Sequence, residues 1–120
     1  MKLKCINMVS TNPAALKDFY CFVLQAPCHE VVPGRYEIPV GEDVFVVITH
    51  TGVKTPVNPD CCGLEFTVDD VDAEYQRLLV AGVSIENEPV TYPWRCRAIG
   101  FRDPDGNFID FVQNLQETAS

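Results

Sequence analysis

The chain lacks a long hydrophobic run, an export signal and an excess of basic residues. None of its apolar stretches approaches the about 20 residues that a membrane-spanning helix needs. Residues 1–4 lead directly into a strand-like pattern, without the apolar region of a signal peptide. The 17 acidic residues outnumber 9 basic ones, and a net charge of −8 repels phosphate backbones and anionic lipids. We therefore expect a cytoplasmic protein, with neither nucleic acid nor membrane as a partner.

The chain also lacks the short motifs that carry nucleotide or thiol chemistry. It contains no nucleophile elbow, no phosphate-binding glycine loop and no dinucleotide fingerprint. Its six cysteines include no Cys-x-x-Cys pair, which excludes a zinc ribbon and a thioredoxin-type motif. Without an export signal they are expected to be reduced thiols. The adjacent pair Cys61-Cys62 is interpreted as incidental or buried, ahead of binding a thiophilic ion.

The most informative motif that is present is Asp-Pro-Asp-Gly-Asn at residues 103–107. Its proline presets φ for a turn, its glycine accepts a positive φ, and its Asp and Asn side chains hydrogen-bond to nearby backbone. With alternating residues after it, the motif predicts a β-hairpin. Asp110 stands between Phe108 and Val112 on one face of the second strand. Because burying an unpaired carboxylate is costly, Asp110 is predicted to mark a pocket.

Hydrophobic periodicity predicts the same order of elements twice. The first half reads as a strand at 3–9, a helix opened by Asn12 and ending near Gln25, and strands at 29–32, 35–40 and 44–49. The second half reads as a strand at 63–68, a helix opened by Asp69 or Asp70 and ending near Gly82, and strands near 84–92, 95–101 and 108–113. Each half is therefore a βαβββ module.

The prediction is one α+β domain over residues 1–120, with modules at about 1–52 and 61–114. The halves share the order of elements and the polar strand face, with negligible sequence identity. Two such modules would join their sheets into one curved, mixed sheet, with helices on the convex face and a polar-lined hollow on the concave face. Such a hollow is a default ligand site.

Several segments then resemble the vicinal oxygen chelate superfamily, which includes glyoxalase I, bleomycin-resistance proteins, fosfomycin-resistance enzymes and extradiol dioxygenases. The segments are Phe19-Tyr20 near the end of the first helix, Val68-Asp69-Asp70-Val71 at the start of the second, the 103–107 turn, and Trp94-x-x-Arg97. Many members have Trp-Gly-x-Arg, and Arg95 replaces that glycine here. The resemblance covers nearly the whole chain and implies the fold, without fixing one activity.

The resemblance also implies where a metal would bind, since enzymes of this superfamily typically hold one divalent ion with ligands from four strands. When the four ligand positions of the superfamily are transferred to this sequence, they fall on Cys5, near Ile48, on Gly63 and on Asp110. Only Asp110 supplies an oxygen ligand of the expected kind, whereas a catalytic ion normally needs about three protein ligands. We therefore expect no metal cofactor. The open alternative is a displaced divalent site formed by Cys5, His50, Glu65 and Asp110.

The residues predicted to contact a small organic ligand are Asn7, Glu65, Trp94, Arg97, Phe108 and Asp110. Arg97 is expected beside Asp110, either clamping an anion or forming a structural Arg–carboxylate pair. Trp94 is interpreted as a pocket wall or as a dimer contact, and Asn7 as a ligand donor or a satisfied core amide. Glu65 and Asp110 are also candidates for an acid/base pair.

We therefore expect a small-molecule binding protein similar to the bleomycin-resistance proteins. It would be a homodimer that sequesters a cationic or aromatic ligand, because a lone curved sheet leaves the hollow half open. One alternative is a metal-dependent lyase, isomerase or dioxygenase that uses the displaced site. Another is a metal-free enzyme that uses Glu65 or Asp110 as its base.

Overall fold

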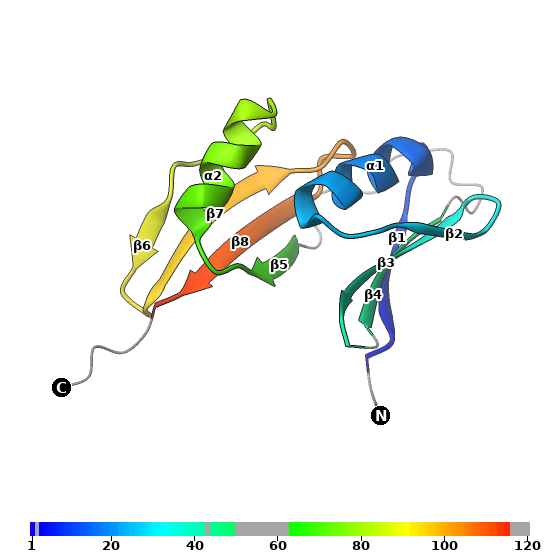
Figure 1. The fold of residues 1–120 in the computed structure, drawn as a ribbon, viewed down its shortest axis with the longest axis horizontal. Coiled ribbons are helices and arrows are strands. Elements are labelled where there is room, and N and C mark those ends of the chain that lie inside the picture. Colours follow the sequence, from blue (N-terminus) through cyan, green and yellow to red (C-terminus); the bar gives the residue numbers. More distant parts are fainter. Residues whose placement is uncertain (2, 43, 50–62, 116–120) are drawn as a thin grey trace. The chain divides into compact units, whose positions relative to one another are not determined.

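The computed structural model describes residues 1, 3–42, 44–49 and 63–115. The chain divides into two compact units, Met1–Asn58 and Pro59–Ser120 (Figure 1). Each unit has four strands and one helix in the order βαβββ among its described residues. The prediction of an α+β chain made of two such modules is confirmed. The single domain and the joining of both sheets into one curved sheet stay predictions.

The first unit contains β1 (Cys5–Val9), α1 (Pro13–Leu24), β2 (His29–Val32), β3 (Arg35–Gly41) and β4 (Val44–Thr49). Its sheet has the order β1-β4-β3-β2, in which β1 is parallel to β4 and the other neighbours are antiparallel. These bounds agree with the prediction to within two residues. The apolar run of β4 is buried in its middle, where Val46, Val47 and Ile48 are at most 1% exposed.

The second unit contains β5 (Gly63–Thr67), α2 (Val71–Val80), β6 (Val90–Tyr92), β7 (Cys96–Arg102) and β8 (Phe108–Asn114). Its sheet has the equivalent order β5-β8-β7-β6, with β5 parallel to β8. The strand predicted near 84–92 is wrong in its first half, since β6 begins at Val90 and Ile85 forms only an isolated bridge. The side chain of Asn87 bonds to β7 there, in place of a continuous backbone ladder.

The helices begin and end at the residues that the sequence indicated. Asn12 accepts a hydrogen bond from the Ala15 amide at 3.3 Å, and Asp70 accepts one from the Ala73 amide at 3.1 Å. Gly82, just after α2, has φ +82°, a conformation that glycine adopts without strain. No helix among the described residues is both long and apolar enough to cross a membrane.

One face of each sheet packs against the helix of the same unit (Figure 1). In the second unit the buried side chains at this face are Leu64, Val71, Leu78, Ile99, Phe101, Ile109 and Phe111. Alternation along a strand sends neighbouring residues to the other face. Gly63, Glu65 and Thr67 of β5 are accordingly exposed. We call this the open face of the second unit.

The predicted turn at 103–107 is confirmed and joins β7 to β8. The Asp103 carboxylate, only 5% exposed, accepts backbone hydrogen bonds from Asp105 and Asn107, both at 2.9 Å, and a third from the Asn107 side chain. Gly106 has φ +87°. This turn fixes where β8 starts, and therefore which residues of β8 face α2.

Candidate functional site

A pair of carboxylates lies on the open face of the second unit. Glu65 on β5 stands directly opposite Asp110 on β8 in the parallel register. Their strand neighbours Leu64, Ile109 and Phe111 are buried on the helix side, which sends both acids to the open face. Glu65 is exposed and Asp110 is half-buried. The predicted proximity of these two acids is therefore present in the structure.

The surroundings of Asp110 disfavour its charged form. Burial raises the pKa of the Asp110 carboxyl above its ordinary value, and the negative charge of Glu65 raises it further. Gly100, the residue opposite Asp110 on β7, contributes no side chain that could pair with it. A cation bound between Asp110 and Glu65 would relieve both the repulsion and the incomplete solvation.

Phe108 forms an apolar surface beside the acids. A Cβ atom at Gly63 would lie 3.3 Å from Cδ1 of this ring, and one at Gly100 would lie 3.0 Å from Cζ. The ring therefore lies close to both neighbouring strands, and a side chain at either glycine would make a tight contact with it. The Arg102 guanidinium lies 5.0 Å from the ring centroid, at cation–π distance.

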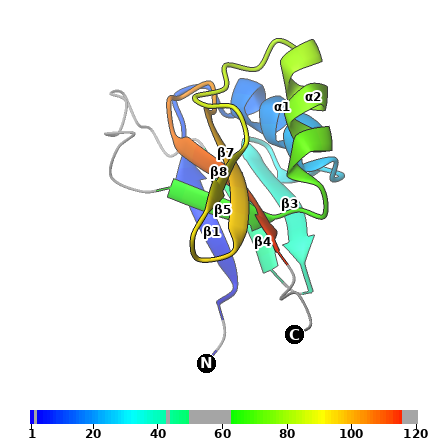
Figure 2. The ribbon, with the colours of Figure 1, turned by 90° about the vertical axis from the view of Figure 1, so that its left-hand side faces the viewer.

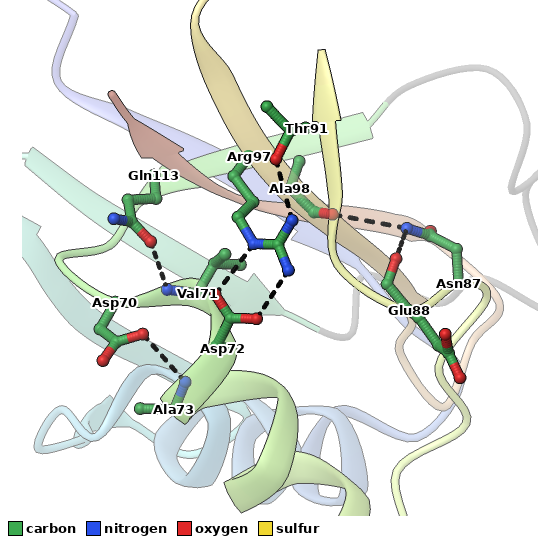
Figure 3. A network of polar contacts seen from close by, with 10 residues as sticks. All are labelled: Asp70, Val71, Asp72, Ala73, Asn87, Glu88, Thr91, Arg97, Ala98 and Gln113. Carbon is green, nitrogen blue, oxygen red and sulfur yellow. Dashed lines mark hydrogen bonds and ion pairs between the residues drawn. The ribbon is translucent and has the colours of Figure 1, made fainter. Parts of the chain in front are cut away.

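Asn87 fixes the loop before β6 onto this region. Its Oδ1 accepts a hydrogen bond from the Gly100 amide at 3.0 Å, and its Nδ2 donates to the carbonyls of Glu88 and Ala98 (Figure 3). Asn87, Gly100 and Arg102 were not predicted as site residues. A signal in the sequence could have indicated this packing: Phe108 lies on β8, and each of the two strands beside β8 has a glycine next to its ring, Gly63 on β5 and Gly100 on β7.

Arg97 does not lie beside Asp110, so that prediction is wrong. Arg97 pairs in register with Gln113, whereas Asp110 pairs with Gly100, and the two parities point to opposite faces. Arg97 donates two hydrogen bonds to the Asp72 carboxylate of α2, at 2.9 and 2.8 Å, and one to Thr91 (Figure 3). This pair links the first turn of α2 to its sheet, which is the structural Arg–carboxylate role with a different acid.

Figure 2 shows the turn that joins β6 to β7. Trp94 belongs to this turn, since β6 ends at Tyr92 and β7 begins at Cys96. On either side of this turn, Tyr92 pairs with Cys96, and Cys96 pairs with Asn114 at the end of β8. Asn114 lies four residues beyond Asp110, so the turn is at the far end of the sheet from the acids. Trp94 is 70% exposed and stacks on Tyr92, with 4.7 Å between ring centroids. The structure thus brings together Glu65, Phe108 and Asp110 but not Trp94.

The remaining predicted residues belong to the first unit or lie outside the described residues. Asn7 is an exposed residue of β1, opposite Val47 of β4. Ile48 pairs instead with Met8 and is fully buried, so it faces α1 and not the side of Cys5 and Asn7. His50 and the Cys61-Cys62 pair lie outside the described residues.

The residues at the expected metal-binding positions do not fit a metal. Gly63 offers no side chain, and a Cβ atom there would already lie 3.3 Å from Cδ1 of the Phe108 ring. Ile48 is apolar and points to the helix side of its sheet. Within residues 1, 3–42, 44–49 and 63–115, no group of three or more His, Cys, Asp or Glu side chains could hold a metal ion. Asp110 is left as the one oxygen ligand of the expected kind.

The fold and this site define a class of protein. A family model described as the Glyoxalase/Bleomycin resistance protein/Dioxygenase superfamily matches residues 2–111, and the chain therefore belongs to this superfamily. A segment of 53 residues is 43% identical to the uncharacterized protein YraH of Bacillus subtilis (strain 168). That segment is 43% of this chain, and it spans only 41% of the length of the curated relative.

Solved structures show the same fold over nearly the whole chain. TnmS3, an antibiotic binding protein from Streptomyces sp. CB03234, is 28% identical with a TM-score of 0.79, over 95% of this chain and 96% of that one. A lactoylglutathione lyase from Agrobacterium tumefaciens is 16% identical with a TM-score of 0.73, over 93% and 92% of the two chains. The fold therefore occurs in both a binding protein and an enzyme.

Proposed function

We propose that the chain binds a small organic cation with an attached aromatic or planar apolar part, on the open face of the second unit and without a catalytic metal. The observation that carries this proposal is the Glu65–Asp110 pair beside Phe108. The antibiotic-binding function stated for TnmS3 supports a binding role for this fold. No covalent step is required of the chain.

Electrostatics and packing support this ligand class together. Two facing carboxylates repel each other, and Asp110 already has a raised pKa because of burial first and Glu65 second. A cation placed between them lowers the free energy of the charged pair, whereas an anion raises it. Phe108 adds apolar surface two residues from Asp110 on the same face, where a planar group can lose contact with water.

The test is a calorimetric comparison of aromatic amines and guanidines with neutral isosteres of the same shape. Asp110→Asn and Glu65→Gln should each weaken binding of the cations by about tenfold or more, which corresponds to about 1.4 kcal/mol. The neutral isosteres should be unaffected by either substitution. Glu74→Gln, on the helix that packs against the other face of this sheet, is the matched control. Cation binding that survives Asp110→Asn unchanged would overturn the proposed site.

Metal content tests the metal-free part of the proposal. The chain is purified without a histidine tag and analysed by plasma mass spectrometry, before and after exposure to Mn, Fe, Co, Ni and Zn. We expect no near-stoichiometric retention. One retained metal that is lost in Asp110→Ala would instead support the displaced site and a metal-dependent lyase, isomerase or dioxygenase.

A second function, metal-free acid–base catalysis, is favoured by the raised pKa of Asp110. A carboxyl that titrates closer to neutral pH exchanges protons with a substrate more readily. Prolonged incubation of each bound compound, followed by NMR, distinguishes the two functions. Chemical conversion that disappears in Asp110→Asn would identify an enzyme, and recovery of the unchanged compound supports binding.

We further propose that the protein acts as a cytoplasmic homodimer. Among the described residues, β1 and β2 are the edge strands of one sheet and β5 and β6 those of the other, and unpaired edge strands favour association with a second copy. Light scattering coupled to size exclusion at micromolar concentration measures the mass directly. A monodisperse monomer would argue against the dimer and would leave the carboxylate site within one chain.

A further inference from the structure

Arg102 places a positive charge on the open face of the second unit. Its partner in the register of β7 and β8 is Phe108, and Gly100, two residues earlier on β7, is the partner of Asp110. Phe101, the neighbour of Arg102 on β7, is fully buried at the face that packs against α2. Because side chains alternate along a strand, Arg102 projects to the same face as Phe108 and Asp110.

The guanidinium of Arg102 is held beside the turn that joins β7 to β8. Its Nε donates a hydrogen bond to Oε1 of Glu86 at 2.8 Å, and its Nη1 donates one to the Gly106 carbonyl at 3.2 Å. Its Cζ lies 5.0 Å from the centroid of the Phe108 ring. Along the chain, Gly106 comes before Phe108 and Asp110 comes after it, so the guanidinium and the carboxylate of Asp110 flank the ring along β8.

The charges around the Phe108 ring are therefore asymmetric. The carboxylates of Glu65 and Asp110 lie on one side of the ring, and the guanidinium of Arg102 lies on the other. Two to four residues separate these groups along an extended strand, which corresponds to about 7–13 Å. The guanidinium repels a cationic group and the carboxylates attract it, so the cation is confined to the side of the acids. A ligand with charges of both signs is favoured in one orientation.

We propose that Arg102 determines the specificity of the candidate site by selecting aromatic zwitterions, whose ammonium and carboxylate groups lie at opposite ends of a planar ring. The ammonium would lie between Glu65 and Asp110, the ring against Phe108, and the carboxylate on the guanidinium. This inference rests on the cation site proposed above and narrows its ligand class from organic cations to zwitterions.

Glu86 shows how a carboxylate binds to this guanidinium. Its oxygen accepts the hydrogen bond from Nε of Arg102 that a ligand carboxylate would accept. Arginine suits such a ligand, because its planar donors match the two oxygens of a carboxylate. The side chains of Arg102 and Glu86 are 34% and 46% exposed, and an ion pair so accessible to water contributes little stability. A ligand carboxylate can therefore displace Glu86, while the bond to Gly106 keeps the guanidinium in place.

The test is an NMR titration of the full chain with benzylamines that differ at the para position. This position carries hydrogen, a carboxylate joined to the ring directly or through one or two methylene groups, or the methyl ester of each acid. We expect at least one acid to bind about tenfold tighter than its ester, because only the acid pairs opposite charges at the guanidinium. Arg102→Gln should remove this preference, and the affinity for unsubstituted benzylamine should not fall.

Two further variants separate the charge of Arg102 from its packing. Glu86→Gln removes the competing carboxylate and should strengthen binding of the acids by about threefold. Arg102→Lys keeps the positive charge without the planar donors and should retain part of the preference for acids. Arg77→Gln, at an arginine of α2 that pairs with Glu74, is the matched control and should leave the preference unchanged. Thermal melts confirm that each variant is folded before titration.

The outcomes distinguish this inference from the proposed function. Benzylamine binding that Asp110→Asn leaves unchanged would overturn the cation site itself. If benzylamine binding depends on Asp110, two results would overturn only the role of Arg102. One is that no acid binds tighter than its ester, and the other is that the preference for acids survives Arg102→Gln. A preference that Arg102→Gln removes and Arg77→Gln preserves supports the selection of zwitterions.

Discussion

Gly100→Ala is the substitution that most directly tests the packing around the candidate site. An added Cβ at Gly100 would lie 3.0 Å from Cζ and 3.1 Å from Cε2 of Phe108, and 3.2 Å from Oδ1 of Asn87. Neither neighbour moves away freely. The opposite edge of the Phe108 ring, at Cδ1, already lies 3.3 Å from the Cβ position of Gly63, so moving the ring away from Gly100 presses it toward β5. The Asn87 oxygen is held by the Gly100 amide.

Two opposing contributions set the change in the free energy of unfolding that Gly100→Ala should cause. Overpacking a well-filled region costs about 1–3 kcal/mol. Replacing a strand glycine by alanine regains about 0.5–1 kcal/mol of backbone entropy. The net expectation is a loss of about 1 kcal/mol in the free energy of unfolding, or a melting temperature lower by about 4 °C. Gly63→Ala should be milder, because its closest ring contact is longer and the residue is exposed.

Urea unfolding of the wild type, Gly100→Ala, Phe108→Leu and the double variant forms a double-mutant cycle. It measures how much of the loss in the free energy of unfolding comes from contact between the added Cβ and the Phe108 ring. In that background Gly100→Ala should become neutral or stabilising, since the shorter side chain withdraws from β7. A wild-type-like stability of Gly100→Ala, or an unchanged loss in the Leu background, would refute the packing described for Phe108.

Three further predictions concern charged groups. Asp110→Asn is expected to stabilise the chain at neutral pH, because burial first and Glu65 second raise the pKa of Asp110 in the folded chain. The charged carboxyl therefore lowers the free energy of unfolding at pH values above that raised pKa, and has no such effect below its unfolded pKa near 3.8. Urea midpoints at acid and neutral pH check this, and equal gains at both would contradict it. Arg97→Ala is expected to destabilise at neutral pH and not in strong acid, because the hydrogen bond from Arg97 lowers the pKa of Asp72 and its contribution disappears as pH falls through that lowered value; melts that stay separate in acid would exclude the pair as the cause. Asp103→Ala should cost about 2 kcal/mol in urea unfolding, since it leaves the amides of its own turn without an acceptor, and a loss near zero would show that water replaces the carboxylate.

The fold was predictable because its signals are local. Alternating strands, the caps at Asn12 and Asp70 and the turn at 103–107 each depend on a few consecutive residues, and each is present in the structure. The exception is the segment before Val90, which was predicted as part of a strand although it contains Asn87 and Pro89, two residues that are depleted in strands. Asn87 bonds there to Gly100 and Ala98 of another strand, and such a contact leaves no local trace in the sequence.

The site was harder to predict because it depends on strand parity. Asp110 was a position carried over from the family, and Glu65 was added because it lies two residues beyond Gly63 on the same strand face; the register places these two acids opposite each other. Arg97 and Ile48 were assigned to the wrong face because one residue of displacement along a strand reverses the side-chain direction. The contribution of Phe108 to packing requires two glycines from different strands, which only the sheet order brings together.

The same substitutions that remove metal ligands create the surface proposed to bind an organic cation. At Gly63 the absence of a side chain leaves room for the Phe108 ring, and the Cβ of a His placed there would lie 3.3 Å from Cδ1 of that ring, a tight contact. A metal-ligating side chain at this position and the aromatic surface therefore compete for the same space. Asp110 persists in both arrangements, but with Glu65 opposite it and no side chain at Gly100 its charge is left to be neutralised by what binds. Restoring a metal should accordingly require changing Gly63 and Phe108 together. A change at Gly63 alone leaves the Phe108 ring in the space that the new ligand needs, and a change at Phe108 alone adds no side chain at position 63 that could bind a metal.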